Sequence, residues 1–285
     1  MMRLTDPTLG YENTLTTCIS GIGTNAFKVK MEAEKEALLK AGDNYVEAGK
    51  KGTLSSILPT DKAIIDPIVI GTLSKSELVN LYNYYFRSKE KEEARKIYSK
   101  LLNAAGDDCP FCGGVGKPRN LDHFLPKARF PQFSILPKNL IPSCLDCNLG
   151  EKGETFATKS DDQIIHPYVD DDRFFNEQWI HARCELDANN RPSSVTYFVE
   201  APKEWDPVHK NRVQKHFKDF GLAETYSLKA AEHLNIQLGT ISELRKENIP
   251  DKIIRSAVID QGVKKAPYIN HWIRGMYQAL SVYLG

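Results

Sequence analysis

The sequence predicts an α+β protein in which mainly helical segments at both ends enclose a small core with four paired cysteines. Apolar residues recur at helical spacing on both sides of that core. Two β-rich runs flank the turn 187–192, and two CxxC pairs in the middle of the chain are separated by 31 residues. With 285 residues, 41% of them hydrophobic, the chain is long enough to bury a sizeable core.

Residues 1–106 are predicted to form a helical N-terminal region. The first 26 residues or so are rich in Thr and Gly, show only a weak pattern and are expected to be an extended arm. Good helix formers with charges at i, i+4 spacing predict a helix over 27–49. Two prolines then mark a connecting loop over 52–72.

Two better-marked helices lead to the first cysteine pair. Ser74 and Glu77 form a capping-box pattern at the start of the first helix. The second helix is predicted over 91–105 from its apolar spacing. Its Arg95 and Tyr98 could touch a substrate, although packing and solvation are the more usual roles of such residues.

The paired cysteines predict a metal site. Their spacing suits four thiolates closing on one structural Zn²⁺, with Cys109, Cys112, Cys144 and Cys147 as the ligands. In a reducing compartment such pairs more often hold metal than form disulfides. Cys18 and Cys184 have no partner at ligand spacing and are expected to be free thiols.

Chemically useful side chains lie between and just after the cysteine pairs. Asp122 and His123 fall on a short strand predicted over 120–124, a second strand is predicted over 139–142, and Asn148 is expected to open a helix. Neighbouring residues of a strand face opposite ways. We therefore expect a bend or bulge that lets Asp122 and His123 serve one site.

The pattern Leu-Asp-His, Asn-Leu, Cys-x-x-Cys-Asn and Lys-Gly resembles the HNH endonuclease family, in its variant with a four-cysteine structural zinc. The resemblance covers about 45 residues, 107–155, of the region 107–160. A lone Asp-His pair would carry no weight, but one framed by two CxxC pairs and two asparagines is specific. The resemblance implies a zinc-stapled ββα-metal core.

The resemblance also implies a role for each motif residue. His123 would be the general base, and Asp122 and Asn148 would hold one catalytic Mg²⁺ or Mn²⁺ ion. Asn139 would fix the loop that carries His123 by hydrogen bonds. Family members commonly have a lysine three residues after the last motif residue; here Lys152, one residue further on, is the candidate for a phosphate contact.

These residue types suit the hydrolysis of a phosphodiester. A neutral imidazole, whose unperturbed pKa is ~6.5, can take a proton from water at physiological pH. A hard cation on Asp and Asn oxygens can clamp the phosphate and the leaving oxygen. A zinc knuckle that only binds a partner would explain the cysteines but would leave Asp122, His123 and Asn148 without a role.

The region 161–202 is acidic and contains a predicted hairpin. Nine acidic and three basic residues give it a net charge of −6, which should repel a nucleic-acid backbone. His166 could line the cleft, but a structural role is preferred. The run Asp170 to Asp172 could bind a cation, but a solvated loop is the preferred interpretation, and this face is expected to point away from substrate. Residues 179–186 and 194–200 have β character around a turn.

The region 203–285 reads as helical and carries a net charge of +4. Helices are predicted from Pro207 onward and over 227–244, 251–263 and 268–283. Three basic residues on one side of the first helix are the best local candidates for phosphate contacts: Arg212, Lys215 and Lys218. A solvated helix face is the alternative.

The sequence thus supports three functional hypotheses. The first is metal-dependent cleavage of nucleic acid, with DNA preferred over RNA as the substrate, because most members of the family that the sequence resembles are DNA nucleases. The second is a nuclease subunit that needs a partner, such as an ATPase or sensor, in a phage-defence or restriction system. The third is a catalytically silent zinc module. The absence of a long apolar run or a secretion signal predicts a cytoplasmic protein.

Overall fold

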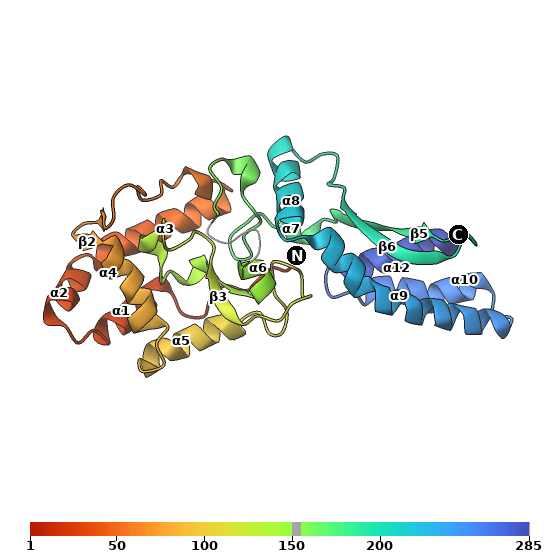
Figure 1. Cartoon of the computed structure of the whole chain (residues 1–285), viewed down its shortest axis with the longest axis horizontal. Coiled ribbons are helices and arrows are strands. Elements are labelled where there is room, and N and C mark those ends of the chain that lie inside the picture. Colours follow the sequence, from red (N-terminus) through yellow and green to blue (C-terminus); the bar gives the residue numbers. More distant parts are fainter. Residues whose placement is uncertain (150–154, 285) are drawn as a thin grey trace.

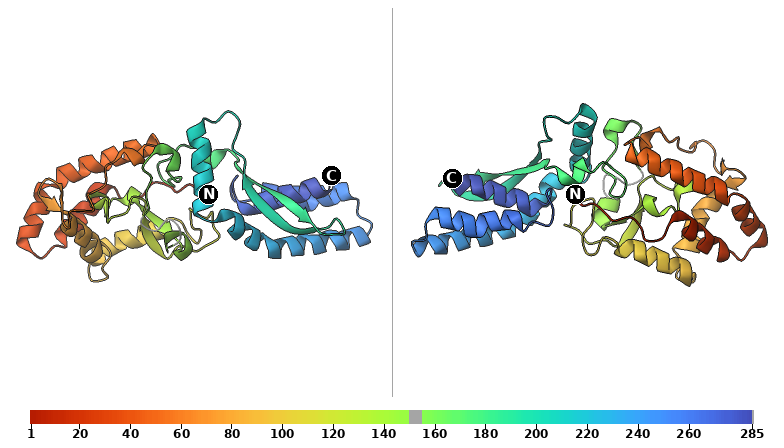
Figure 2. Two further views of the ribbon diagram at one scale, coloured as in Figure 1. Left: turned by 45° about the horizontal axis from the view of Figure 1, so that its top comes forward. Right: turned by 180° about the vertical axis from the view of Figure 1, so that it is seen from behind.

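The computed structural model describes residues 1–149 and 155–284. Its elements form two lobes that lie side by side, and the N terminus lies at their junction (Figures 1 and 2). The helices of the N-terminal lobe are α1 (Tyr11–Ser20), α2 (Asn25–Ala33), α3 (Lys35–Lys50), η1 (Leu54–Ser56), α4 (Lys75–Asn80), η2 (Leu81–Phe86) and α5 (Glu92–Asn103). This lobe also holds the short strands β1 (Ile68–Ile70) and β2 (Leu73–Ser74).

The predicted cysteine-bearing core completes the N-terminal lobe. It consists of β3 (Asn120–His123), η3 (Pro131–Phe133), η4 (Pro137–Asn139), β4 (Leu140–Ser143) and α6 (Leu145–Leu149). Strands β3 and β4 pair antiparallel, with Asn120 opposite Ser143 and His123 opposite Leu140. The described part of the core therefore has the order strand, strand, helix. Both strands lie within about one residue of the predicted ones.

The junction and the C-terminal lobe follow. The junction holds η5 (Ser160–Asp162), α7 (Arg173–Asn176) and α8 (Pro207–Asp219). The C-terminal lobe consists of β5 (Ile180–Leu186), β6 (Pro192–Val199), α9 (Leu222–Lys246), α10 (Asp251–Ile254), η6 (Arg255–Ile259), α11 (Asp260–Lys264) and α12 (Trp272–Leu284). The predicted hairpin is present as β5 and β6, with α12 packed against β5 and α9 against β6.

Helices combined with three two-stranded antiparallel sheets in the described residues confirm the predicted α+β class. The capping box at the start of α4 is also confirmed. The Ser74 hydroxyl accepts from the Glu77 amide at 3.4 Å, and the Glu77 carboxylate accepts from the Ser74 amide at 2.9 Å. Within these described parts of the chain, no helix has both the length and the hydropathy needed to cross a membrane.

The first 26 residues are not an extended arm, so that prediction was wrong. Helix α1 occupies much of this segment and buries Leu15, Cys18 and Ile19. It packs against α3 and α5, which lie far along the chain. The gain from burying these apolar side chains outweighs the weak local helix propensity of a Thr-rich segment.

The single helix predicted over 27–49 is interrupted at Glu34, which lies between α2 and α3. Helix formers continue through this position, so the cause of the break is tertiary. The Glu34 carboxylate accepts from the backbone N–H of Thr72 at 2.9 Å and from its hydroxyl at 3.1 Å. The break thus joins the helical pair to the turn between β1 and β2.

Two groups of buried apolar side chains form the core. The N-terminal cluster packs α1 to α5 against the core residues Leu121, Ile135 and Leu140. The central cluster includes the paired cysteines, Ile141 and Tyr45 and extends into the C-terminal lobe. Strand β4 contributes Leu140 to the N-terminal cluster and Ile141 to the central cluster, so the ladder that carries Asp122 and His123 lies between them.

Candidate functional site

Four buried cysteines form a compact group, as the sequence predicted. The Sγ atoms of Cys109, Cys112, Cys144 and Cys147 all lie within 4.8 Å of one another, and those of Cys112 and Cys144 are 4.0 Å apart. A tetrahedral zinc site with Zn–S bonds of ~2.3 Å has sulfur–sulfur edges of about 3.8 Å. The group could therefore hold a metal ion such as zinc.

The backbone of the first knuckle is shaped to approach the sulfurs. Gly113 and Gly114 have positive φ values of 61° and 82°, which side-chain-bearing residues rarely adopt. The chain then returns so that the Gly116 amide donates to Cys112 Sγ at 3.2 Å. A Cβ on Gly116 would lie 2.6 Å from Cys144 Sγ, so glycine is required for this close approach.

The charge balance of the sulfur group calls for a cation. Hydrogen bonds from Cys112 and the other two thiols lower the pKa of Cys109. The same closeness, with Cys109 as the largest cause, raises the pKa of Cys112 and Cys147. The pKa of Cys144 is lowered as well, because the opposing effect of Cys109 is outweighed by hydrogen bonds from Cys112 and Cys147. Two thiolates thus form easily and hinder the other two, so four thiolates require a positive ion among them.

The two remaining cysteines lie outside this group, as predicted. Cys18 is fully buried in the N-terminal cluster, and burial raises its thiol pKa to about 12. Cys184 is half-buried on β5, and burial raises its pKa to about 11. Both remain thiols at physiological pH and are poor nucleophiles and metal ligands.

Strand β3 ends with Asp122 and His123, and its register with β4 is regular. Asp122 lies opposite Ile141, whereas His123 lies opposite Leu140. Directly opposed residues share a face and neighbours alternate, so Asp122 and His123 lie on opposite faces of the ladder. The expected bend or bulge was therefore wrong for this strand pair. The two side chains share one end of the strand instead of one face.

The His123 ring is held in a defined orientation. It is only 8% exposed, and its Nε2 lies 2.9 Å from the Ser134 carbonyl oxygen. A carbonyl can only accept, so Nε2 carries the proton and Nδ1 is the basic nitrogen of this tautomer. Ser134 is itself held, because its hydroxyl donates to the Leu78 carbonyl at 2.8 Å.

Aromatic and charged neighbours complete the surroundings of Asp122 and His123. The Tyr82 ring meets the His123 ring edge-on, with centroids 4.5 Å apart, and Lys127 Nζ lies 5.2 Å from the Tyr82 centroid. Asp122 lies close enough to Tyr82 and Tyr45 that its charge adds to burial in raising the pKa of both phenols. The sequence analysis did not connect Tyr82 with His123.

Asn139 occupies the position expected of a residue that holds a loop. It is fully buried, and its Oδ1 accepts from the Leu125 amide at 2.8 Å and from the Tyr45 hydroxyl at 2.9 Å. Its Nδ2 donates to the carbonyls of Leu125 at 3.1 Å and Phe133 at 3.0 Å. All the usual hydrogen bonds of the amide are formed within the segment 124–134 and with Tyr45.

The other two motif residues are Asn148, which the structure describes, and Lys152, which it does not. Asn148 is half-buried in α6 and does not open that helix, which begins at Leu145; its amide donates to the Cys144 carbonyl at 3.1 Å. The helix starts three residues before Asn148 and therefore includes Cys147 of the second cysteine pair. Lys152 lies outside the described residues.

Two predictions about charged residues in the second half of the chain were wrong. Asp170 is not solvated, and Arg212 is not available to phosphate: their side chains are 0% and 2% exposed and form an ion pair with each other. Lys215 pairs with Asp219 at 2.6 Å on the same helix. Of the three predicted phosphate contacts only Lys218 is exposed without an ion pair among the described residues.

Comparison with known proteins gives a match over nearly the whole chain. Protein ea31 of Escherichia phage lambda is 34% identical to it over 291 residues, which span 99% of this chain and 97% of that protein. The chain belongs to the ea31 family. Septu protein PtuB of Bacillus thuringiensis is 37% identical over 81 residues, which cover 26% of this chain and 30% of that protein. No family model and no solved structure gives a significant match.

Proposed function

We propose that the chain is a metal-dependent nuclease of the HNH type, in which His123 activates the water that attacks a phosphodiester. The observation that carries the proposal is the held imidazole at the end of β3, in the same short core as a four-cysteine group that could hold zinc. The partial likeness to Septu protein PtuB adds support. DNA is the first substrate to test.

The chemistry assigned to His123 follows from its tautomer. With Nε2–H directed to the Ser134 carbonyl, Nδ1 takes the proton of the attacking water. The carbonyl dipole then stabilises the imidazolium that forms. The neighbouring Tyr82 ring prevents the imidazole from turning, so the basic nitrogen keeps its direction through the reaction.

Asp122 and Asn148 are the proposed ligands of one divalent cation. Carboxylate and amide oxygens are the donors that Mg²⁺ and Mn²⁺ accept, and both residues lie in the stapled core, on β3 and α6. Such a cation would supply the charge that a phosphate and its leaving alkoxide require. Asp122 and His123 would act from opposite faces of the ladder, with the phosphodiester at its end.

The test is cleavage of supercoiled plasmid, linear duplex, single-stranded DNA and RNA, each with Mg²⁺ or EDTA. His123→Ala should retain zinc and fold but lower the cleavage rate by ~10² to 10⁴, the usual effect of losing a general base. Asp122→Ala and Asn148→Ala should show a defect that high Mg²⁺ or Mn²⁺ partly restores. His181→Ala, on β5 in the C-terminal lobe, is the matched control and should cleave like wild type. Undiminished cleavage by His123→Ala would refute the mechanism.

The second candidate is a nuclease subunit of a phage-defence system that is active only with a partner protein. The partial match to Septu protein PtuB, over 26% of this chain and 30% of that protein, is the comparison that supports it. Inactivity of the isolated protein on all four substrates, followed by activity when a co-purified partner is added, would support this candidate. Inactivity in both cases would support a silent zinc module.

A further inference from the structure

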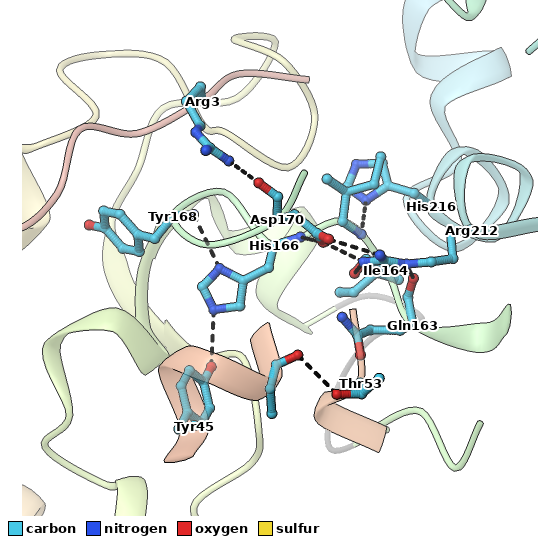
Figure 3. Close-up of polar contacts among 12 residues, drawn as sticks. Arg3, Tyr45, Thr53, Gln163, Ile164, His166, Tyr168, Asp170, Arg212 and His216 are labelled. Atoms are coloured by element: carbon cyan, nitrogen blue, oxygen red, sulfur yellow. Dashed lines mark hydrogen bonds and ion pairs between the residues drawn. The ribbon is translucent and has the colours of Figure 1, made fainter. Parts of the chain in front are cut away.

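A line of hydrogen bonds among buried residues joins helix α8 to the segment 124–134, which follows the candidate base, and Figure 3 shows its part from Arg212 to Tyr45. It runs from Arg212 on α8 through Asp170 and His166 to Tyr45 on α3, and it ends on Asn139. Each of these five side chains is at most 2% exposed. Buried polar groups are costly to leave unpaired, so every bond along this line restricts its neighbours.

Arg212 and Asp170 anchor one end of the line. The Arg212 guanidinium bonds both carboxylate oxygens of Asp170, with Nη1 to Oδ1 at 2.8 Å, and its Nε donates to the Gln163 carbonyl at 2.9 Å. A two-pronged guanidinium–carboxylate pair has one favourable geometry. The Asp170 Oδ2 also accepts from the backbone N–H of His166 at 2.8 Å, which fixes the histidine at its main chain.

The His166 ring can bond in only one sense. Its Nδ1 accepts from the Tyr168 amide at 3.1 Å, so the ring proton of the neutral form is on Nε2. Burial, reinforced by the charge of Arg212, lowers the pKa of His166 well below 6.5, so the ring is neutral at physiological pH. Nε2–H therefore donates to the Tyr45 oxygen, 3.0 Å away.

The hydrogen bond that Tyr45 accepts from His166 determines the direction of the next bond, from Tyr45 to Asn139. Because the Tyr45 oxygen accepts from His166, its own O–H donates to Asn139 Oδ1 at 2.9 Å. That contact fixes which end of the Asn139 amide is oxygen and which is nitrogen. The amide in turn holds Leu125 at both its N–H and its carbonyl, two residues after His123.

We propose that Tyr45 and His166 are positioning residues for the candidate base, through which the Arg212–Asp170 pair at the lobe junction orients Asn139 and hence the segment 124–134. This proposal rests on the proposed nuclease function for its catalytic consequence, but its structural part stands independently. Neither Tyr45 nor His166 reaches solvent, so both act through Asn139 and not by touching substrate. A small displacement of His123 is enough to slow the reaction.

The matched pair of variants is Tyr45→Phe and Tyr168→Phe. Each removes one buried hydroxyl and keeps the ring, but the Tyr168 hydroxyl has no hydrogen-bond partner in the described parts of the chain. Tyr45→Phe should lower kcat about tenfold with an unchanged KM. It should also speed hydrogen exchange at the Leu125 amide about tenfold. Tyr168→Phe should match wild type in both measurements, and zinc content should be equal in all three proteins.

A second variant tests whether the two residues act through one bond. His166→Phe should reproduce the losses of Tyr45→Phe, and the double variant should be no more than about twofold worse than the poorer single variant. Independent, multiplying losses would overturn the proposed line of action.

Failure of this inference and failure of the proposed function are distinguishable. If wild type cleaves and Tyr45→Phe matches Tyr168→Phe in kcat and in exchange at Leu125, the positioning role is overturned while the nuclease stands. If wild type cleaves nothing, the nuclease proposal fails and exchange at Leu125 alone decides the structural part. Faster exchange in Tyr45→Phe then supports it, and unchanged exchange overturns it.

Discussion

The two halves of the stapled core are held in different ways. Each cysteine pair lies in a short local segment, the first with turns at Gly113 and Gly114 and a return at Gly116, and the pairing of β3 with β4 brings the two segments together. The segment that carries His123 is held by side chains from α3, from the junction and from the stretch before β4. The cysteine group should therefore depend on metal, whereas the His123 segment should depend on long-range packing and hydrogen bonds.

This difference implies that some mutations should change the stability of the core, whereas others should change only the position of the segment 124–134. Loss of a metal ion held by the four cysteines would remove a constraint on both strands of the core at once. Loss of one hydrogen bond near Asn139 leaves the core folded and changes only how firmly the segment 124–134 is held. The following variants test this comparison, beginning with the largest expected effect.

Cys109→Ser or Cys144→Ser should unfold or aggregate the protein. A structural zinc can contribute ~10 kcal/mol or more of folding free energy, which exceeds the net stability of many domains. Metal analysis of the wild type should find one zinc per chain under non-chelating conditions. Less than about half an equivalent, or variants that melt like wild type, would contradict the site.

Asn139→Ala should destabilise the protein by about 2 to 4 kcal/mol while zinc content stays at wild-type level. It leaves the Tyr45 hydroxyl and the main-chain groups of Leu125 and Phe133 without their partner. The measurement is urea unfolding. Asn120→Ala is the control, because the Oδ1 of Asn120 is buried without a hydrogen-bond partner in the described residues, and it should cost less than about 1 kcal/mol. Equal effects of the two variants would show that the bonds of Asn139 are unimportant.

Acid should weaken both sides of the comparison, because His166 bonds Tyr45 and His216 bonds the Phe111 carbonyl inside the first cysteine pair. Burial lowers the pKa of His166 well below 6.5 and that of His216 to about 3. Below pH ~6.5 the unfolded chain binds protons that the folded chain refuses, so stability falls as the pH falls from ~6.5 towards 3. Each histidine contributes up to about 1.4 kcal/mol per pH unit. Unfolding midpoints at pH 7.5 and 5 measure the slope, and a variant lacking His166 should show a smaller slope than wild type.

Replacing Cys18 with Ala and Cys184 with Ser should have the smallest effect. Neither thiol belongs to the metal group, so zinc content should stay the same. Only the small loss of packing at Cys18, of the order of 1 kcal/mol, is expected. A double variant that lost zinc would overturn the ligand assignment.

The sequence by itself determined the features that depend on local spacing. The paired cysteines, the capping box of Ser74 and Glu77, the strands β3 and β4, and the β5–β6 hairpin all follow from residues close together in the chain. Their patterns are strong because each is produced by one local requirement: a ligand set, a helix start or a period of two. The four-cysteine group predicted from the CxxC spacing is present, and the roles that the resemblance implies for Asp122, His123 and Asn148 stay predictions.

The burial and the hydrogen-bond partners of the charged and aromatic residues depend on the tertiary structure and could not be predicted from the sequence. Arg212 and Asp170 read as solvated charges in the sequence, but each becomes buried because the other neutralises it across the junction. Tyr45 bonds partners 94 and 121 residues away, at distances along the chain where no local pattern can indicate a contact. The break at Glu34 and the helix at Tyr11–Ser20 likewise arise from packing between remote segments, whose free energy outweighs local propensity.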